Sequence, residues 1–426
     1  MAVSPTSLSK RSLSLDHQSL SQILVNQENV LIIQDLDGVC MGLVKDPLTR
    51  VMEIRYIKAV KSLEKHFFVL TNGEHIGQRG VNGIVERALG DRDLVREQGL
   101  YLPGLAGGGV QWQDCDGNVS HPGIGDIEMS FLQAIPQKLR YFLQKIAQLP
   151  QYNLTQVQLE KCINATVLDN KVSPTANLNV FHEVLIDQPG LYADLQQEIK
   201  AFTDHLLEEA QQQGLSDSFF VHYAPNLGRD EQGKEIMQLS QDKDSGTTDF
   251  QFMLRGALKE AGVLVILNHY YYLQTGEYPL GKDFNVRKAP SKQQGLIKLV
   301  KDKFDPAIMP TILGVGDTVT SKAVDKDGQI EFKRGGSDRG FLELVQILGR
   351  EFNTDNVVIY VDSSGGEVKN RQGLELDRSD PQNIKVIKGA GDKRDTEDPL
   401  TLNFVFPEGH QQYIDFFCHI AISRSV

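Results

Sequence analysis

Two aspartates, Asp35 and Asp37, stand at the end of a short apolar run in the segment LIIQDLDGV. The run is typical of a buried strand that ends at Gly38, and alternation along a strand sends both carboxylates to one face. One carboxylate can attack an electrophile while the other transfers a proton, and both can hold Mg²⁺, which takes oxygen ligands. The pair therefore indicates phosphoryl transfer through an aspartyl intermediate. The alternative is a plain turn, because Asp and Gly are turn residues.

Polar side chains also follow two further apolar runs. FFVLTNG ends in Thr71, Asn72 and Gly73, whose hydroxyl, amide and backbone N–H groups suit phosphate oxygens. PTILGVGDT ends in the acid Asp317 and a threonine. Each of these endings alone is more typical of a turn. Because ligands bind at the carboxyl ends of parallel strands, their ordered appearance predicts one shared site.

A phosphate site also needs a cation that neutralises developing charge. The best candidate is Lys292 in APSKQQGLIKLV, just before an expected helix. Lys288 and Arg287 are alternatives, and a lysine at a helix start is usually a solvated surface residue.

The elements that must position these residues alternate between strands and helices. Apolar residues recur at helical spacing, and short apolar runs lie between the helices. We expect helices over 51–66, 80–90, 295–304 and 339–352, and strands over 67–73, 310–318 and 357–366 besides the first run. This order predicts an α/β fold with a mostly parallel sheet and helices on its faces.

Residues 125–285 form a separate block within this pattern. A long helical stretch covers 193–214, and strand-like runs cover 218–224 and 261–273. The block predicts an α+β domain inserted into the first. The expected organisation is a mobile tail over 1–15, a core over 16–124 and 286–426, and the inserted domain over 125–285.

Composition limits the possible partners and location. The 426 residues carry a net charge of −12, which argues against nucleic acid or an anionic membrane as partner. No apolar run reaches the ~18 residues of a membrane helix. The widely spaced cysteines are expected to be free thiols in a reducing cytoplasm; they are Cys40, Cys115, Cys162 and Cys418.

The ordered set DLDGV, LTNG, SKQQG and GVGDT resembles the haloacid dehalogenase superfamily of phosphotransferases, whose core is Rossmann-like. The resemblance implies that Asp35 is the nucleophile and that Asp37 is the general acid and then the base. It implies that Thr71 and Lys292 bind the transferred phosphoryl group. It also implies that Mg²⁺ lies on Asp35, the backbone carbonyl of Asp37, and Asp317.

One feature departs from the superfamily pattern. A second acid usually follows the first by three or four residues in the fourth motif, but a threonine and a serine stand there. SDRGFLELV, residues 337–345, resembles the second half of that motif, and an inserted hairpin with its turn at 327–328 is expected before it. We therefore expect Asp338 to be the displaced acid, ligating Mg²⁺ directly or through water. Alternatively it only caps the helix, and Asp325 is a poorer candidate.

The position of the insertion resembles the sugar-phosphatase branch, which has a large α+β cap. Only 33 residues separate Asp37 from Thr71, so the cap falls between Thr71 and Lys292. Such a lid implies a small sugar or polyol phosphate as substrate. His222, Tyr270 and Tyr272 are candidate sugar contacts, although tyrosines in a cap strand are more often packing residues.

Longer segments, including FFVLTNGEHIG and RGGSDRGFLELV, resemble the salt-tolerance phosphatases of cyanobacteria. That resemblance implies hydrolysis of 2-O-glucosylglycerol 3-phosphate, and the synthase that makes this compound is a candidate partner. Sucrose phosphate or trehalose phosphate remains an alternative substrate. A sugar phosphomutase and a non-catalytic regulator of the synthase are remoter alternatives.

Overall fold

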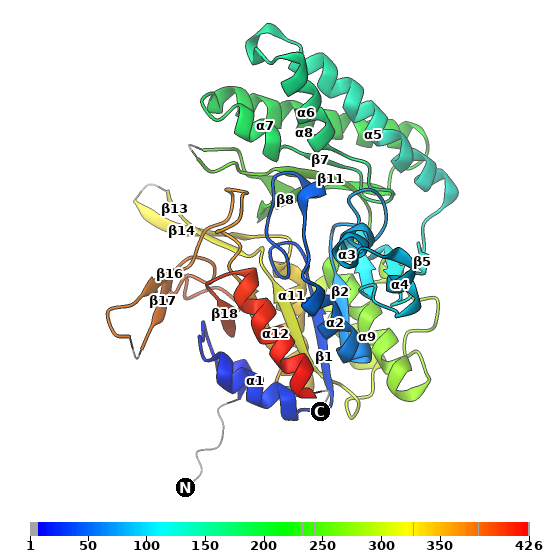
Figure 1. Cartoon of the computed structure of the whole chain (residues 1–426), viewed down its shortest axis with the longest axis vertical. Helices are drawn as coiled ribbons and strands as arrows, with labels where there is room; N and C mark the ends of the chain where they lie inside the picture. Colours follow the sequence, from blue (N-terminus) through cyan, green and yellow to red (C-terminus); the bar gives the residue numbers. More distant parts are fainter. Residues whose placement is uncertain (1–6, 232–233, 242, 327, 382, 425–426) are drawn as a thin grey trace.

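An eight-stranded sheet forms the centre of the computed structural model, which describes residues 7–424 except 232–233, 242, 327 and 382 (Figure 1). Neighbouring strands from β18 to β3 pair in parallel, and β4 and β5 continue the edge antiparallel. The α/β prediction with a mostly parallel sheet is confirmed. In sheet order the strands are β18 (Phe404–Phe406), β15 (Val357–Val361), β12 (Thr311–Gly316), β1 (Val30–Gln34), β2 (Phe67–Leu70), β3 (Gly104–Ala106), β4 (Gln111–Gln113) and β5 (Val119–Ser120).

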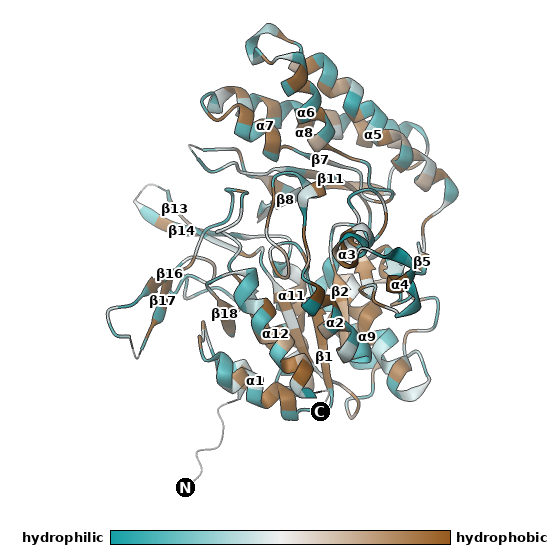
Figure 2. Ribbon diagram, in the orientation of Figure 1, coloured by the Kyte–Doolittle hydropathy of each residue, from teal (hydrophilic) through white to brown (hydrophobic). Residues whose placement is uncertain are grey.

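Helices cover both faces of this sheet, because its central strands are apolar on both sides (Figure 2). In β1, Leu31 and Ile33 pack with one set of helices, and Val30 and Ile32 pack with the other. The first set is α9 (Lys259–Thr275), α10 (Gln293–Lys303) and α11 (Arg339–Phe352). The second is α1 (His17–Asn26), α2 (Ile54–Leu63), α3 (Val81–Leu89) and α12 (His410–Arg424).

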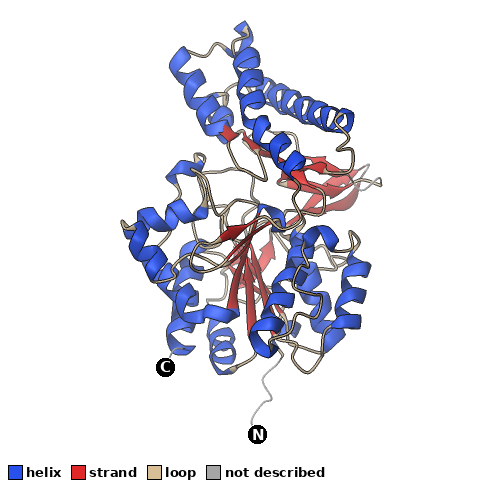
Figure 3. Cartoon of the chain, turned by 90° about the vertical axis from the view of Figure 1, so that its right-hand side faces the viewer, coloured by secondary structure: helices blue, strands red, loops and turns tan. Residues whose placement is uncertain are grey.

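A second layer of structure lies above the carboxyl edge of the main sheet (Figures 1 and 3). Its antiparallel sheet has the order β6-β7-β11-β8, and helices cover the side away from the core. The strands are β6 (Val167–Leu168), β7 (Thr175–Asn177), β8 (Phe219–Ala224) and β11 (Asp249–Leu254). The helices are α5 (Asp126–Ala147), α6 (Gln156–Thr166), α7 (Asn179–Val184) and α8 (Pro189–Gln212). We refer to this layer as the cap.

The strand expected over 261–273 is wrong, because this segment belongs to helix α9. The helix is apolar almost all round and packs against α10, α11 and β2 of the core. A helix buried on all sides loses the 3.6-residue pattern that would reveal it. Since α9 lies with the core, we place the end of the cap near residue 258 rather than 285.

The mobile tail expected over 1–15 is contradicted from residue 7 onward. Leu8 and Leu13 are buried, and the backbone N–H of Leu13 donates to the carbonyl of Leu402 at 2.7 Å. The backbone N–H of Leu8 also donates to the Asp355 carboxylate at 2.7 Å. Buried apolar side chains and these hydrogen bonds together hold the segment against the core. Residues 1–6 lie outside the described part of the chain.

Three hairpins extend from the core. One joins β4 to β5, where the backbone N–H of Gly117 donates to the carbonyl of Asp114 at 3.2 Å. The inserted hairpin expected from the sequence is formed by β13 (Thr320–Lys326) and β14 (Gln329–Gly335). A third hairpin, of β16 (Glu375–Asp377) and β17 (Lys385–Lys388), was not predicted. Among the described residues, no helix is long and apolar enough to cross a membrane. All four cysteines are free.

The anchoring of the N-terminal segment can be tested with Leu8→Ala. Removing this fully buried side chain is expected to lower the free energy of unfolding by about 2–4 kcal/mol. Urea denaturation measures the change. Val157→Ala is the control, because that side chain is 78% exposed and its loss should cost less than about 0.5 kcal/mol. Equal midpoints for the two variants would mean that the segment is detached in solution.

Candidate active site

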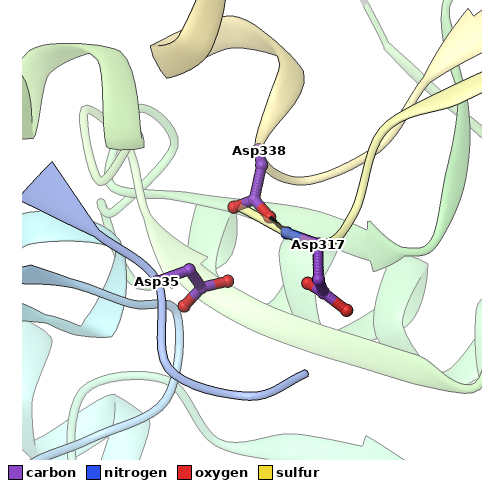
Figure 4. A group of neighbouring side chains, drawn as sticks. All are labelled: Asp35, Asp317 and Asp338. Atoms are coloured by element: carbon purple, nitrogen blue, oxygen red, sulfur yellow. Dashed lines mark hydrogen bonds between the residues drawn. The ribbon is translucent and has the colours of Figure 1, made fainter. Parts of the chain in front are cut away.

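Three aspartates meet at the carboxyl edge of the main sheet. Asp35 follows β1, Asp317 follows β12, and Asp338 directly precedes α11. Because β1 and β12 are adjacent parallel strands, their ends lie side by side. One carboxylate oxygen from each aspartate lies within 4.8 Å of those of the other two, and all three residues are buried. Figure 4 shows the three side chains around one common space, each from a different element.

Asp338 is held in this cluster and does not cap its helix with its side chain. Its Oδ2 accepts the backbone N–H groups of Asp317 and Thr318 at 3.0 and 2.9 Å. The approach is so close that a Cβ on Gly316 would come within 2.7 Å of the same oxygen. The structure thus brings together two acids that the hairpin separates in sequence, as expected. Asp325 lies exposed on that hairpin.

Lys259 supplies a buried cation beside Asp35 and Asp338. Its Nζ lies 2.7 Å from Oδ2 of Asp35 and 2.6 Å from Oδ1 of Asp338. The residue is the first of α9 and is only 3% exposed. An ammonium bonded to two carboxylates in a buried place is strongly oriented, so Lys259 is fixed beside Asp35.

The expectation that Lys292 supplies this cation is wrong. Lys292 is an exposed residue at the start of α10. The two alternative candidates also have other partners. Arg287 pairs with Glu128 at 2.5 Å, and Lys288 donates to the carbonyl of Asp283 at 2.9 Å. None of the three is among the described residues that line the cavity at the aspartates.

Burial dominates the electrostatics of the cluster. It raises the pKa of Asp35 above its usual range, although the Lys259 ammonium partly opposes this rise. The carboxylates of Asp338 and Asp317 raise the pKa of Asp35 further. Burial also raises the pKa of Asp317, against the nearby Arg371 guanidinium. For Lys259, burial alone would lower the pKa, but Asp338 and Asp35 together raise it, so the ammonium stays charged.

The donor set of the cluster fits a divalent metal ion. Two of the three buried carboxylates, those of Asp35 and Asp338, pair with Lys259, and the Nε of Arg371 lies 3.6 Å from Oδ2 of Asp317. That Asp317 oxygen is buried and has no hydrogen-bond partner in the described part of the chain. Mg²⁺ prefers oxygen ligands, and a dication would offset the excess negative charge. Asp35, Asp317 and Asp338 are therefore the residues that could hold it.

The other predicted residues of the core lie around the same cavity, which has a volume of about 110 Å³. Asp37 is bonded through Oδ1 to the Nε of Arg50 at 2.7 Å. The Oγ1 of Thr71 accepts the backbone N–H of Gly73 at 3.2 Å, and Asn72 lies between them. The site therefore combines a buried carboxylate that can act as a nucleophile, a second carboxylate, and hydroxyl and amide donors.

The cap closes the opposite side of this cavity with polar side chains rather than aromatic ones. They come mainly from β7, β11 and the loop before β7, and are Asn170, Thr175, Asn177, Asn179, Thr248, Asp249 and Gln251. Asp249 is fixed there, because its Oδ1 accepts the Nδ2 amide of Asn177 at 2.8 Å. The Oε1 of Gln251 is buried without a hydrogen-bond partner among the described residues. This wall can bind hydroxyl groups.

The predicted sugar contacts of the cap fall elsewhere. His222 binds Asn72 through Nε2 at 3.1 Å and Glu235 through Nδ1 at 2.9 Å, and it lines a neighbouring cavity of about 280 Å³. Tyr270 and Tyr272 lie on α9 of the core. Tyr270 is fully buried, and Tyr272 stacks on Tyr278 at the surface. Both tyrosine predictions are wrong, because they assumed a cap strand at this place.

Comparison with known proteins places the chain in a family. Residues 29–421 match the family described as glucosylglycerol-phosphate phosphatase (Salt_tol_Pase). A curated glucosylglycerol-phosphate phosphatase from Synechocystis sp. is 55% identical over 419 residues, which cover 98% of this chain and 99% of that protein. The chain belongs to the glucosylglycerol-phosphate phosphatase family. The resemblance seen in the sequence motifs is thereby confirmed, and the family is one of phosphoric monoester hydrolases.

Solved structures of other phosphatases overlap with this chain only loosely. The C-terminal domain of trehalose-6-phosphate phosphatase from C. albicans has a TM-score of 0.46 and 11% identity, covering 96% of this chain and 98% of that one. Trehalose-6-phosphate phosphatase from Aspergillus fumigatus has a TM-score of 0.36 and 12% identity, covering 84% and 92%. Overlaps of this size support no statement about function.

Sequence reasoning missed Lys259 although a signal was present. The apolar run after GALKEAG is longer than the 4–8 residues of a typical buried strand, and its length favours a helix. A lysine at the start of that helix is the equivalent of the one sought at Lys292. Arg50 and Arg371, which also line the cavity, carry no such signal, because their loops are placed only by the fold.

The identity of the cationic residue can be tested by comparing Lys259→Met with Lys292→Met. Loss of the buried ammonium is expected to lower the kcat for phosphate release about 10²–10³-fold. The same change at the exposed Lys292 should leave kcat within about two-fold. Circular dichroism checks that both variants are folded. Similar kcat values for the two variants would refute the assignment of Lys259.

Proposed function

We propose that this protein is a Mg²⁺-dependent phosphatase that hydrolyses 2-O-glucosylglycerol 3-phosphate to glucosylglycerol and phosphate. The observation that carries the proposal is the buried Asp35–Lys259 pair, which lies beside Asp317 and Asp338 in a cavity covered by the cap. Membership of the glucosylglycerol-phosphate phosphatase family supports the choice of substrate.

In the first half-reaction, a carboxylate oxygen of Asp35 attacks phosphorus and the bond to the substrate oxygen breaks. Asp37 gives its proton to the departing alkoxide, which leaves as the polyol hydroxyl. The product on the enzyme is an acyl phosphate on Asp35. Lys259 stabilises both the attacking carboxylate and the transferred phosphoryl group, and Thr71 donates its hydroxyl to a phosphoryl oxygen.

In the second half-reaction, Asp37 removes a proton from water, which attacks the phosphorus of the acyl phosphate. The bond to Asp35 breaks, and phosphate and the free carboxylate are released. Arg50 holds Asp37 in place at the cavity wall. When bound by Asp35, Asp317, Asp338 and the backbone carbonyl of Asp37, Mg²⁺ would neutralise charge on the phosphate and on the carboxylates.

We assign recognition of the sugar to the polar wall of the cap. Asn177, Asp249 and Gln251 face the cavity from adjacent strands and offer amide donors and carbonyl or carboxylate acceptors. The buried Oε1 of Gln251 lacks a partner, and a substrate hydroxyl can donate to it. Because an unpaired buried acceptor disfavours ligands that cannot bond to it, this wall selects a polyhydroxylated substrate.

We further propose a cytoplasmic location and contact with the synthase that makes the substrate. Four free cysteines fit a reducing compartment. Contact with the synthase would pass the shared intermediate directly to this site, and the catalytic scheme does not depend on it.

The proposed activity can be tested by phosphate release from a panel of phosphomonoesters. The panel contains glucosylglycerol phosphate, sucrose phosphate, trehalose phosphate and glycerol phosphate, each with Mg²⁺ or with EDTA. We expect selective hydrolysis of glucosylglycerol phosphate, lost in EDTA and restored by Mg²⁺. Asp35→Asn removes the nucleophile and should lower kcat more than about 10³-fold.

Each other outcome of the panel has a definite meaning. Mg²⁺-dependent hydrolysis of another sugar phosphate would keep the chemistry and reject the substrate. Turnover only with an added bisphosphate activator would indicate a mutase. No turnover at all would favour a non-catalytic regulator. Undiminished activity of Asp35→Asn would reject the aspartyl-phosphate scheme.

The role of the cap wall can be tested with Gln251→Leu. Loss of one neutral hydrogen bond is expected to raise the KM for glucosylglycerol phosphate about 3–10-fold. Hydrolysis of para-nitrophenyl phosphate, which has no sugar hydroxyls, should not change. Gln211→Leu, on the exposed face of α8, is the matched control. Equal effects on both substrates would show that Gln251 does not contact the sugar.

A further inference from the structure

Glu74 is a buried acid that the catalytic scheme does not use. It follows directly after Gly73, and it is 3% exposed. Its Oε1 accepts the backbone N–H groups of Val172 and Ser173 at 2.7 and 2.9 Å, and the Ser173 hydroxyl at 3.1 Å. Its Oε2 accepts the backbone N–H of Lys171 at 2.9 Å. A side chain of the core therefore binds three successive N–H groups of the cap.

The core side of this contact is firmly held. The backbone N–H of Gly107 donates to the carbonyl of Gly73 at 2.6 Å, and that of Gly108 donates to the carbonyl of Thr71 at 3.1 Å. The backbone N–H of Val81 donates to the carbonyl of Glu74 at 2.9 Å. Glu74 is thus rigidly joined to residues 71–73, which we call the phosphate loop.

The cap side of the contact leads directly to the cavity. The Oγ1 of Thr175 donates to the carbonyl of Ser173 at 2.7 Å, and the Nδ2 of Asn170 donates to the same carbonyl at 3.2 Å. Both Asn170 and Thr175 line the catalytic cavity. We call residues 170–175 the cap loop. Its two cavity-lining side chains are fixed to Ser173, which is bound to Glu74.

Burial raises the pKa of Glu74, but the hydrogen bonds from Val172, Lys171 and Ser173 oppose this rise because they favour the ionised carboxylate. Successive backbone N–H groups form a concave site for an anion, and hydrogen bonds to an ionised acceptor are roughly twice as strong as neutral ones. Every group named around the carboxylate is a donor. A neutral amide of the same shape would direct its own N–H groups at backbone donors and leave some of them unpaired.

From this geometry we infer that Glu74 is a positioning residue that holds the cap loop in register with the phosphate loop. It sets the distance between the groups that bind the sugar and those that bind the phosphoryl group. The inference rests on the proposed function, since it assigns the cap loop to the sugar. Loss of the contact should weaken binding of a substrate that spans both loops, and spare a phosphomonoester that needs only the phosphate loop.

The test compares Glu74→Gln with the parent enzyme on two substrates in the presence of Mg²⁺. For glucosylglycerol phosphate, KM is expected to rise at least about ten-fold, because several hydrogen bonds across the two loops are lost. For para-nitrophenyl phosphate, kcat/KM should stay within about two-fold. Amide hydrogen exchange supplies a direct readout, with faster exchange expected at residues 171–173 in the variant.

Glu128→Gln is the matched control. Glu128 is also a buried acid at the junction of cap and core, where it pairs with Arg287, but it does not line the catalytic cavity. Glu128→Gln should leave the ratio of the kcat/KM values for the two substrates unchanged. If Glu74→Gln and Glu128→Gln shift this ratio equally, any weakening of the contact between cap and core is sufficient for the shift. That result would overturn the role of Glu74.

A milder variant keeps the proposal testable if Glu74→Gln does not fold. Ser173→Ala removes one donor to Glu74 and should raise the KM for glucosylglycerol phosphate about 2–5-fold. The kcat/KM for para-nitrophenyl phosphate should not change. The inference would be overturned if neither Glu74→Gln nor Ser173→Ala changed the KM for glucosylglycerol phosphate. It would also be overturned if kcat/KM fell equally for both substrates. A parent enzyme that releases phosphate from para-nitrophenyl phosphate but not from glucosylglycerol phosphate would instead refute the proposed function.

Discussion

The burial of like charges at the end of β1 is the constraint on which the rest of the structure depends. Asp35, Asp317 and Asp338 are removed from water within one small volume, where unpaired charges are strongly unfavourable. Lys259 bridges Asp35 and Asp338 and makes this burial tolerable. The helix that starts at Lys259 must therefore lie against the sheet edge, and this brings the end of the cap back to the core.

The division of labour between the two layers follows from that arrangement. The parallel sheet fixes the reacting groups, since adjacent strand ends are held by backbone hydrogen bonds. The antiparallel sheet of the cap supplies amides and a carboxylate from several positions on two adjacent strands. Residues of both layers bound one cavity, and polar contacts between its buried side chains are stronger than they would be in bulk water. The contacts around Glu74 join the two layers at the point where their roles meet.

The predictions for the site succeeded where a residue lies within a few positions of a strand end. Asp35, Asp37, Thr71 and Asp317 all lie at one cavity, as the pattern of apolar runs predicted. The prediction of Asp338 required one further step, because the β13–β14 hairpin had to be recognised as an insertion between the two acids. The prediction of the lysine was wrong, because a helix that is buried on all sides has no hydrophobic periodicity to distinguish it from a strand.

The sequence by itself determined the α/β class, the central strands β1, β2, β12 and β15, and the acids that follow β1 and β12. These are local properties, because strand ends and turn residues are encoded within a few positions of each other. Only the tertiary structure decided that Lys259 meets Asp35, that the cap presents Asp249 and Gln251, and that residues 7–15 are anchored. Such contacts join segments far apart in the chain, and their partners are selected by packing and by the cost of leaving a buried charge unpaired.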